Sequence, residues 1–307
     1  MTQGVLLISH GTVDDLADLP AFLTNIRRGH APPPDLVHEV RRRYEAIGGR
    51  SPLNALCGEL ACQLEGRLRL PVRACQRLWK PTAEEGLRAL VDAGVRDIAV
   101  VPLAQHSAPL YGEAVQKAAD ALLAQGGPAL RLRPAANWGQ EPALLDAYAD
   151  ALRSTVAAAG AKDETLVVMT AHSLPVAVVR SGDPYEQEVR TSAAAIAARL
   201  GAAMPRWVLA FQSQGMSSGP GGRPVEWLGP DLDTTFAEAR RSGARSVVLA
   251  PIGFLADHVE ILYDLDIEAK ANLEAMGLRY ARTPSLNATP AMVTAVEGVA
   301  RRLLETS

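Results

Sequence analysis

The chain has 307 residues, of which 48% are hydrophobic and 21% are charged, and its net charge at pH 7 is −3. This composition is typical of a globular protein and excludes a disordered chain. Because the chain carries no net positive charge to attract phosphates, we expect no nucleic-acid partner. The length favours two domains, each large enough to bury a core without disulfides or a structural metal.

The three cysteines, Cys57, Cys62 and Cys75, are too few for a disulfide framework. They also fall short of the four thiolates of an iron–sulfur cluster, so no cluster is expected. The N-terminus lacks the basic region of a signal peptide. The longest apolar run, residues 247–256, is about half a membrane span and contains a proline and a glycine. These features predict a cytoplasmic protein without a transmembrane segment, and they leave the oligomeric state open.

Short β-branched runs bounded by Gly, Pro or Ser alternate along the chain with longer Ala-, Leu- and Arg-rich stretches of helical pattern. Strands that are hydrophobic throughout and separated by helices are typical of parallel sheets covered on both faces, so the predicted fold class is α/β. In chain order, the expected strands are 5–9, 98–103, 166–170, 207–212 and 246–252, and the expected helices are 82–93, 113–124, 141–159 and 184–200.

The two halves of the chain resemble each other. Residues 94–102 read GVRDIAVVP, and residues 243–251 read GARSVVLAP. A repeat of this length favours two similar α/β domains, which we place at residues 1–150 and 151–307, with the C-terminal helix free to pack on the first domain. The alternative is that both segments are a common turn from a helix into a buried strand.

Four of the six histidines, His10, His106, His172 and His258, fall just after expected strands. Ligands bind at the carboxyl ends of the strands in open parallel sheets, so this placement indicates a candidate site. His172 lies in the motif TAHSLP, where Pro175 ends the strand and fixes the turn. A neutral imidazole there can accept a proton near pH 7 or bind a divalent metal. A structural histidine is the alternative.

Three carboxylates, Glu260, Asp264 and Glu268, follow one another at i, i+4 and i+8. On an α-helix they stack along one face, with a drift of about 40° per step. Their apolar neighbours, including Ile261 and Ile267, indicate that much of this helix is buried. Buried carboxylates need hydrogen bonds, protons or cations, so the row suits a divalent metal or a proton path. A solvated acidic stripe is the alternative.

Other candidate binding residues lie in Gly-rich surroundings. Trp227, in the motif EWLGPD, follows a Gly/Ser-rich stretch at 216–224 that has the composition of a mobile loop. One interpretation is that its indole forms an apolar wall against a flat ligand. The alternative is that the tryptophan has a structural role. The motif IRRG around Arg28 and the motif GGRSPLN around Ser51 combine cationic and Gly-rich elements that suit an anionic substrate.

The ordered set of motifs resembles the ferrochelatase family over nearly the whole chain. The motifs are GVLLISHGT, IRRG, RYEAIGGRSPLN, TAHSLP, DPY, FQSQG, WLGPD and GFLADHVEILYDLDIE. The resemblance implies two similar Rossmann-like domains that enclose a porphyrin cleft. It also implies the insertion of Fe²⁺ into a porphyrin, with release of two protons, to give haem in haem biosynthesis.

By this resemblance, His172 and Glu260 are the catalytic residues, which bind the metal and remove the pyrrole protons. Asp264 and Glu268 correspond to a row that is proposed in the family to carry metal or protons. The chain resembles most closely the compact bacterial enzymes that act on coproporphyrin III. Protoporphyrin IX, another ring such as sirohydrochlorin, or another metal is the alternative. A further alternative is a non-catalytic carrier of haem or metal. In a carrier, Glu260 would be dispensable for binding the ligand.

The resemblance also implies the substrate-binding residues. Arg28 and Ser51 fall in segments that contact porphyrin propionates or the outer metal region in related enzymes. From its flat apolar indole, we also expect Trp227 at the substrate. His10 departs from the family, because the bacterial relatives carry tyrosine at this position. We expect His10 to approach the iron of the product from the face opposite His172. The alternative is that His10 only hydrogen-bonds its own loop.

Overall fold

The computed structural model describes residues 2–214 and 224–305. It confirms the α/β fold class, with two four-stranded parallel sheets and helices between the strands. The chain divides into two compact units. Unit 1 comprises Met1–Ala143, Ala256–Val259 and Asn287–Ser307, and unit 2 comprises Leu144–Leu255 and Glu260–Leu286. Among the described residues, no helix has the length and apolar character needed to cross a membrane.

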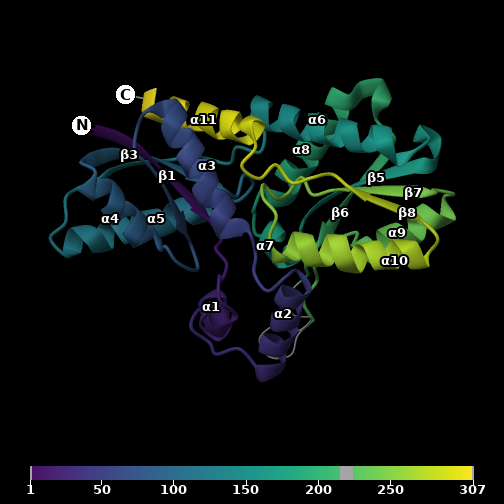
Figure 1. Cartoon of the computed structure of the whole chain (residues 1–307), viewed down its shortest axis with the longest axis horizontal. Coiled ribbons are helices and arrows are strands. Elements are labelled where there is room, and N and C mark those ends of the chain that lie inside the picture. The colour runs from purple at the N-terminus through teal and green to yellow at the C-terminus, as the bar shows by residue number, and fades with distance from the viewer. Residues whose placement is uncertain (1, 215–223, 306–307) are drawn as a thin grey trace. The chain divides into compact units, whose positions relative to one another are not determined.

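Unit 1 is built on a sheet with the strand order β2-β1-β3-β4 (Figure 1). Strands β1 and β3 are almost entirely buried, as expected for a parallel sheet that is covered on both faces. The elements of this unit are β1 (Thr2–Ser9), η1 (Leu16–Asp18), α1 (Leu19–Ile26), α2 (Pro34–Ala46), α3 (Leu53–Leu68), β2 (Val72–Gln76), α4 (Ala83–Asp92), β3 (Val95–Pro102), α5 (Ala108–Ala124), β4 (Arg131–Pro134) and α11 (Pro290–Glu305).

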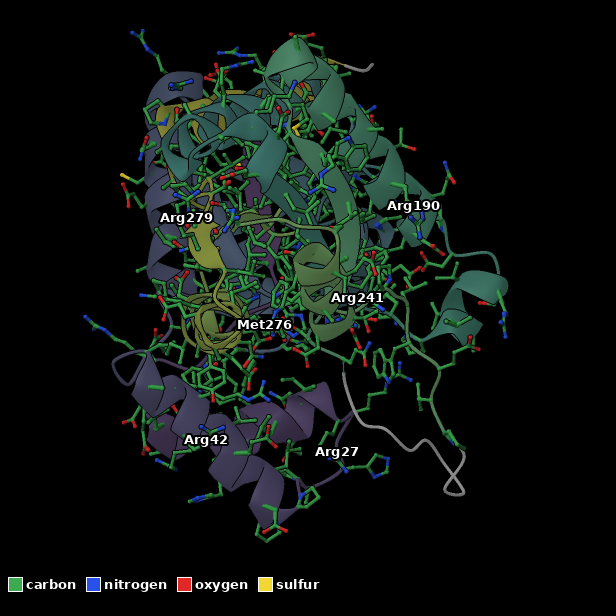
Figure 2. All side chains as sticks on the ribbon, turned by 90° about the vertical axis from the view of Figure 1, so that its right-hand side faces the viewer. Arg27, Arg42, Arg190, Arg241, Met276 and Arg279 are labelled. Carbon is green, nitrogen blue, oxygen red and sulfur yellow. The ribbon has the colours of Figure 1, made fainter. Side chains whose placement is uncertain are left out.

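Helices cover both faces of this sheet. Helices α4 and α5 pack together on one face, and α3 and α11 pack together on the other (Figure 1). The core under α4 and α5 includes Leu6, Leu87, Ile98 and Val115, all without exposed surface. Helices α1 and α2 enclose a smaller core around Tyr44. Figure 2 labels Arg27, directly after α1, and Arg42, on α2. The C-terminal helix thus contributes to the unit formed mainly by the first half of the chain.

Unit 2 repeats the plan with the strand order β6-β5-β7-β8. The two repeated sequences form β3 and β7, which occupy equivalent places in the two sheets, so the predicted similarity of the two halves is confirmed. The remaining elements are α6 (Pro142–Ala159), η2 (Lys162–Glu164), β5 (Thr165–His172), α7 (Val176–Arg180), α8 (Tyr185–Leu200), η3 (Gly201–Ala203), β6 (Arg206–Gln212), α9 (Leu232–Arg241), β7 (Ser246–Ala250), the π-helix η5 (Glu260–Ala269), α10 (Lys270–Ala275) and β8 (Arg279–Arg282).

Within unit 2, α6 and α8 lie on one face of the sheet and α9, η5 and α10 on the other (Figure 1). The guanidinium of Arg190, on α8, lies 5.9 Å from the centre of the Phe211 ring of β6, which ties this helix to the sheet. Figure 2 shows Met276 and Arg279 at the two ends of the turn from α10 into β8. The Arg279 Nε atom donates a hydrogen bond of 2.9 Å to the hydroxyl of Ser246, at the start of β7.

Some observed elements and boundaries differ from the predicted ones. The boundary that we placed after residue 150 falls inside α6, and the chain first passes from unit 1 to unit 2 after residue 143. Strands β2, β4 and β8 were not predicted. Strands β4 and β8 are four-residue edge strands that contain two arginines each, so they lack the apolar run that indicated the other strands. The stretch 216–224 lies, except for Pro224, outside the described residues.

Candidate active site

His172 is the last residue of the buried strand β5, where it pairs with Gln212 of β6. Its side chain is half-buried, and its Nδ1 atom lies 3.3 Å from the backbone carbonyl oxygen of Gln212. Because a carbonyl oxygen only accepts hydrogen bonds, Nδ1 must carry the hydrogen in this contact. In the neutral imidazole the lone pair then lies on Nε2, so this contact fixes the tautomer of a base or metal ligand.

The turn after His172 is held by several hydrogen bonds. The hydroxyl of Tyr185 donates to the His172 carbonyl oxygen at 2.9 Å. The backbone N–H of Ser173 donates to the Gln212 carbonyl oxygen at 2.8 Å, and the Ser173 hydroxyl donates to the Leu228 carbonyl oxygen at 2.9 Å. Trp227, which is half-buried, forms an antiparallel bridge with Pro175 in the same turn. The structure therefore brings the predicted residue Trp227 to the segment that carries His172.

Phe254 lies beside the His172 ring, with 6.5 Å between the ring centres and 32° between the ring planes. Gly253, the preceding residue, lies directly against β5, and its N–H donates a hydrogen bond of 3.0 Å to the Thr170 carbonyl oxygen. A Cβ atom on Gly253 would lie 2.6 Å from the Cβ atom of Ala171, which is closer than van der Waals contact allows. The loop can pack against β5 in this way only with glycine at position 253.

The three carboxylates of the acidic row lie on a helix of unexpected type. We predicted an α-helix, but η5 is a π-helix, whose hydrogen bonds run from i to i+5. Glu260 is its first residue and is half-buried, Asp264 is buried, and Glu268 is exposed. The row therefore runs from a half-buried residue through a buried one to the surface.

The prediction that much of this helix is buried is confirmed. Ile261, Tyr263 and Leu265 are buried, whereas Ile267 is 39% exposed. Asp264 accepts a hydrogen bond of 2.6 Å from the hydroxyl of Ser213, which lies just after β6 and has a left-handed backbone (φ 57°). This contact supplies one of the partners that a buried carboxylate needs. Among the described residues, no three His, Cys, Asp or Glu side chains are grouped so as to hold a metal ion.

The other predicted binding residues belong to unit 1. His10 is exposed, and its Nδ1 atom lies 3.4 Å from the hydroxyl of Tyr111. Arg28 is exposed in the turn after α1, with a left-handed backbone (φ 56°). Ser51 is buried, and its hydroxyl oxygen lies 3.4 Å from the backbone nitrogen of Leu53, at the start of α3. Of these three residues, only His10 and Arg28 therefore present exposed side chains.

The four histidines after strands differ in environment. His106 is 4% exposed, and burial lowers its pKa to about 4, so its imidazole is neutral at pH 7. His172 is half-buried, His10 is exposed, and His258 is half-buried. The pattern of histidines at strand ends therefore includes at least one, His106, that is suited to a structural role.

The model of the ferrochelatase family matches residues 2–304 of this sequence. The chain belongs to the ferrochelatase family. It is 33% identical over 321 residues to a ferrochelatase of Acidobacterium capsulatum, an alignment that covers 98% of this chain and 94% of the relative. It is also 33% identical over 312 residues to the coproporphyrin III ferrochelatase of Geobacillus kaustophilus, with 97% of this chain and 95% of the relative covered.

A solved structure agrees with the fold. SirB from Bacillus subtilis, solved with Fe³⁺, has a TM-score of 0.60 and 16% sequence identity, and the match covers 99% of this chain and 96% of SirB. At this identity the likeness concerns the fold alone. Membership of the ferrochelatase family makes this protein an enzyme that inserts a metal ion into a porphyrin, so the porphyrin and the metal ion are its substrates.

Sequence reasoning missed several residues around His172. Tyr185 and Gly253 lie within the motifs DPY and GFLADHVE, but their sequence does not reveal that one bonds the His172 carbonyl oxygen and the other packs on β5. Gln212 lies in FQSQG. It contacts His172 Nδ1 through its backbone carbonyl oxygen, an atom that every residue type has. Only the register of β5 against β6 reveals this contact.

Proposed function

We propose that this protein inserts Fe²⁺ into coproporphyrin III to form an iron porphyrin of haem biosynthesis, with His172 and Glu260 as the catalytic residues. The observation that carries the proposal is the contact between His172 Nδ1 and the Gln212 carbonyl oxygen, which keeps the lone pair on Nε2. The choice of Fe²⁺ and of coproporphyrin III is supported by the printed names of relatives, several of which are coproporphyrin III ferrochelatases.

The chemistry requires two bases. As Fe²⁺ replaces the two pyrrole hydrogens, both N–H bonds break, four iron–nitrogen bonds form, and two protons leave the ring. In our proposal His172 Nε2 takes one proton, and the imidazolium that results keeps its Nδ1–H on the Gln212 carbonyl oxygen. Glu260 takes the other. Glu260 is half-buried and is the first residue of η5.

The remaining predicted residues have supporting roles in this proposal. Asp264 and Glu268 carry metal ions or protons along η5, between the half-buried Glu260 and the surface. Arg28 and Ser51 contact the propionates or the outer metal region, and Trp227 walls the flat ring beside the turn that follows His172. The exposed His10 contacts the product iron.

The test is an anaerobic assay of the purified protein with Fe²⁺ and either coproporphyrin III or protoporphyrin IX, followed by the Soret and visible bands. We expect catalytic conversion of coproporphyrin III at substoichiometric protein. Faster conversion of protoporphyrin IX than of coproporphyrin III would overturn the assignment of the ring, but the proposed insertion of iron into a porphyrin would stand. Binding of both rings without turnover would favour a haem or metal carrier and overturn the proposed function.

A further inference from the structure

Asn287 and Asp257 are joined by two hydrogen bonds. The Asn287 Oδ1 atom accepts from the backbone N–H of Asp257 at 2.8 Å, and the Asn287 Nδ2 atom donates to Asp257 Oδ2 at 3.0 Å. A side-chain amide offers an acceptor and a donor on one planar group, so it can bind the backbone and the carboxylate of one residue together. The pair therefore fixes both the backbone and the side chain of Asp257, from a position 30 residues later in the chain.

Asn287 is itself held from its C-terminal side. Its backbone is left-handed (φ 52°), a conformation that asparagine tolerates better than most residues. On α3, Gln63 donates to the carbonyl oxygen of Ala288 at 2.8 Å, and Arg67 donates to the hydroxyl of Thr294 at 2.8 Å. A sparsely populated backbone conformation persists where its surroundings determine it, and here α3 fixes the chain directly after Asn287.

Asp257 lies shortly before the start of the π-helix. Two residues, His258 and Val259, separate it from Glu260, the first residue of η5. Within unit 1, Val259 packs against the core around Tyr44, so residues 257 and 259 are both anchored. Because Asp257 and Val259 are fixed, the backbone that leads into Glu260 has few conformations left to it.

We propose that Asn287 is a positioning residue for metal insertion, which acts by holding Asp257 and thereby the backbone that presents Glu260. The inference rests on the proposed role of Glu260. A displacement of about 1 Å in a catalytic group can lower the rate about a hundredfold, so the loss of this pair affects the catalytic step more than the binding of the ring.

The test compares Asn287→Ala, Asn287→Asp and the exchanged pair Asp257→Asn with Asn287→Asp in the anaerobic assay. We expect Asn287→Ala to lower kcat about tenfold or more, with KM for the porphyrin changed less than about twofold. Asn287→Asp places a second carboxyl group beside that of Asp257, and the two repel each other when both are ionised. As the pH falls and one of the two is protonated, the kcat of this variant should rise relative to that of the unsubstituted protein. The exchanged pair restores the amide–carboxylate contact in reverse and should recover kcat to within about threefold.

The matched control is Asn272→Ala, which removes an amide–carboxylate contact of 3.2 Å with Asp233 at the surface of unit 2 and should leave kcat unchanged. Thermal melting identifies variants that fail to fold, and the exchanged pair tests the proposal even if Asn287→Ala is one of them. Normal kcat in Asn287→Ala, or an exchanged pair no faster than Asn287→Asp, would overturn the positioning role.

Glu260→Gln and the unsubstituted protein are measured in the same assay. If the unsubstituted protein turns over and Glu260→Gln does not, the proposed function stands, whatever the outcome for Asn287. Absence of turnover in the unsubstituted protein would overturn the proposed function and the positioning role together.

Discussion

The phenolic hydroxyl of Tyr185 donates a 2.9 Å hydrogen bond to the backbone carbonyl oxygen of His172, 13 residues earlier in the chain. Tyr185 is 5% exposed, so its hydroxyl has little access to water. This bond ties the end of β5 to the start of α8. The first residue of α8 thereby supports the proposed base.

Tyr185→Phe should lower kcat about three- to tenfold, because a buried hydrogen bond contributes roughly 0.5–1.5 kcal/mol and its loss frees the end of β5. The melting temperature should fall slightly, since the His172 carbonyl oxygen loses its buried partner. Steady-state kinetics and thermal melting check both effects. An unchanged kcat with a lowered melting temperature would show that the bond serves stability alone.

His172→Ala should nearly abolish metal insertion and leave the protein folded, because the imidazole is only half-buried and lies at the last residue of β5. The matched control is His38→Ala, which removes an exposed histidine of α2 and should keep full turnover. The anaerobic assay and circular dichroism measure the two properties. Substantial turnover in His172→Ala would refute the assignment of His172 as the base.

His10→Phe should change the visible spectrum of bound product haem, because an imidazole nitrogen near the iron is replaced by a ring that cannot ligate it. The side chain is exposed, so we expect no loss of stability. Spectra of the two proteins with equal amounts of product give the comparison. Identical spectra would mean that His10 serves only its own loop.

Gly253→Ala should destabilise the protein by about 1–3 kcal/mol, because the new Cβ atom would lie 2.6 Å from the Cβ atom of Ala171 and the loop must move away. The movement carries Phe254 away from the His172 ring, so turnover should fall as well. Gly243→Ala is the control, since a Cβ atom at that position meets no atom within 4 Å and its strain is confined to the backbone. Urea unfolding measures the difference.

Asp97 and Arg133 form a two-contact ion pair on neighbouring strands of unit 1, with distances of 2.7 and 3.0 Å. The hydrogen bonds from Arg133 hold the pKa of Asp97 below its usual range. A lowered pKa in the folded state adds stability above the unfolded pKa, near 4, and this stability is lost as the pH falls through the folded pKa. Asp97→Asn should therefore melt several degrees lower at pH 7.

The pH dependence of this difference in melting temperature tests the charge of Asp97 more directly than its value at pH 7 does. The melting temperatures of the Asp97→Asn variant and the unsubstituted protein should converge as the pH falls through the lowered pKa of Asp97, where its carboxyl group takes up a proton. The exposed Asp150, paired with Arg153, provides the control Asp150→Asn, which should change the melting temperature little at any pH. A melting-temperature difference that stays constant as the pH falls from 7 through the acid range would contradict the role of the charge.

The fold could be predicted from the sequence because its central strands are apolar runs between helical stretches. Strand β5 was predicted to end at residue 170, but it continues to His172, because the ladder with β6 extends to Gln212. Periodicity could not reveal the π-helix, since a spacing of i, i+4 and i+8 is compatible with either type of helix. The contact between Asn287 and Asp257 depends on tertiary packing across 30 residues and has no local pattern.

Unit 1 is assembled from three separate stretches of the chain, the last of which carries α11. The buried side of this helix, with Val293, Val296 and Ala300, covers the same face of the sheet as α3. On the ribosome, β1, β3 and α3 emerge long before α11 does, and one sheet face stays partly uncovered until α11 has been made. The half of the protein that is made first therefore completes its core only with a late helix, and until then its apolar strands are exposed to aggregation.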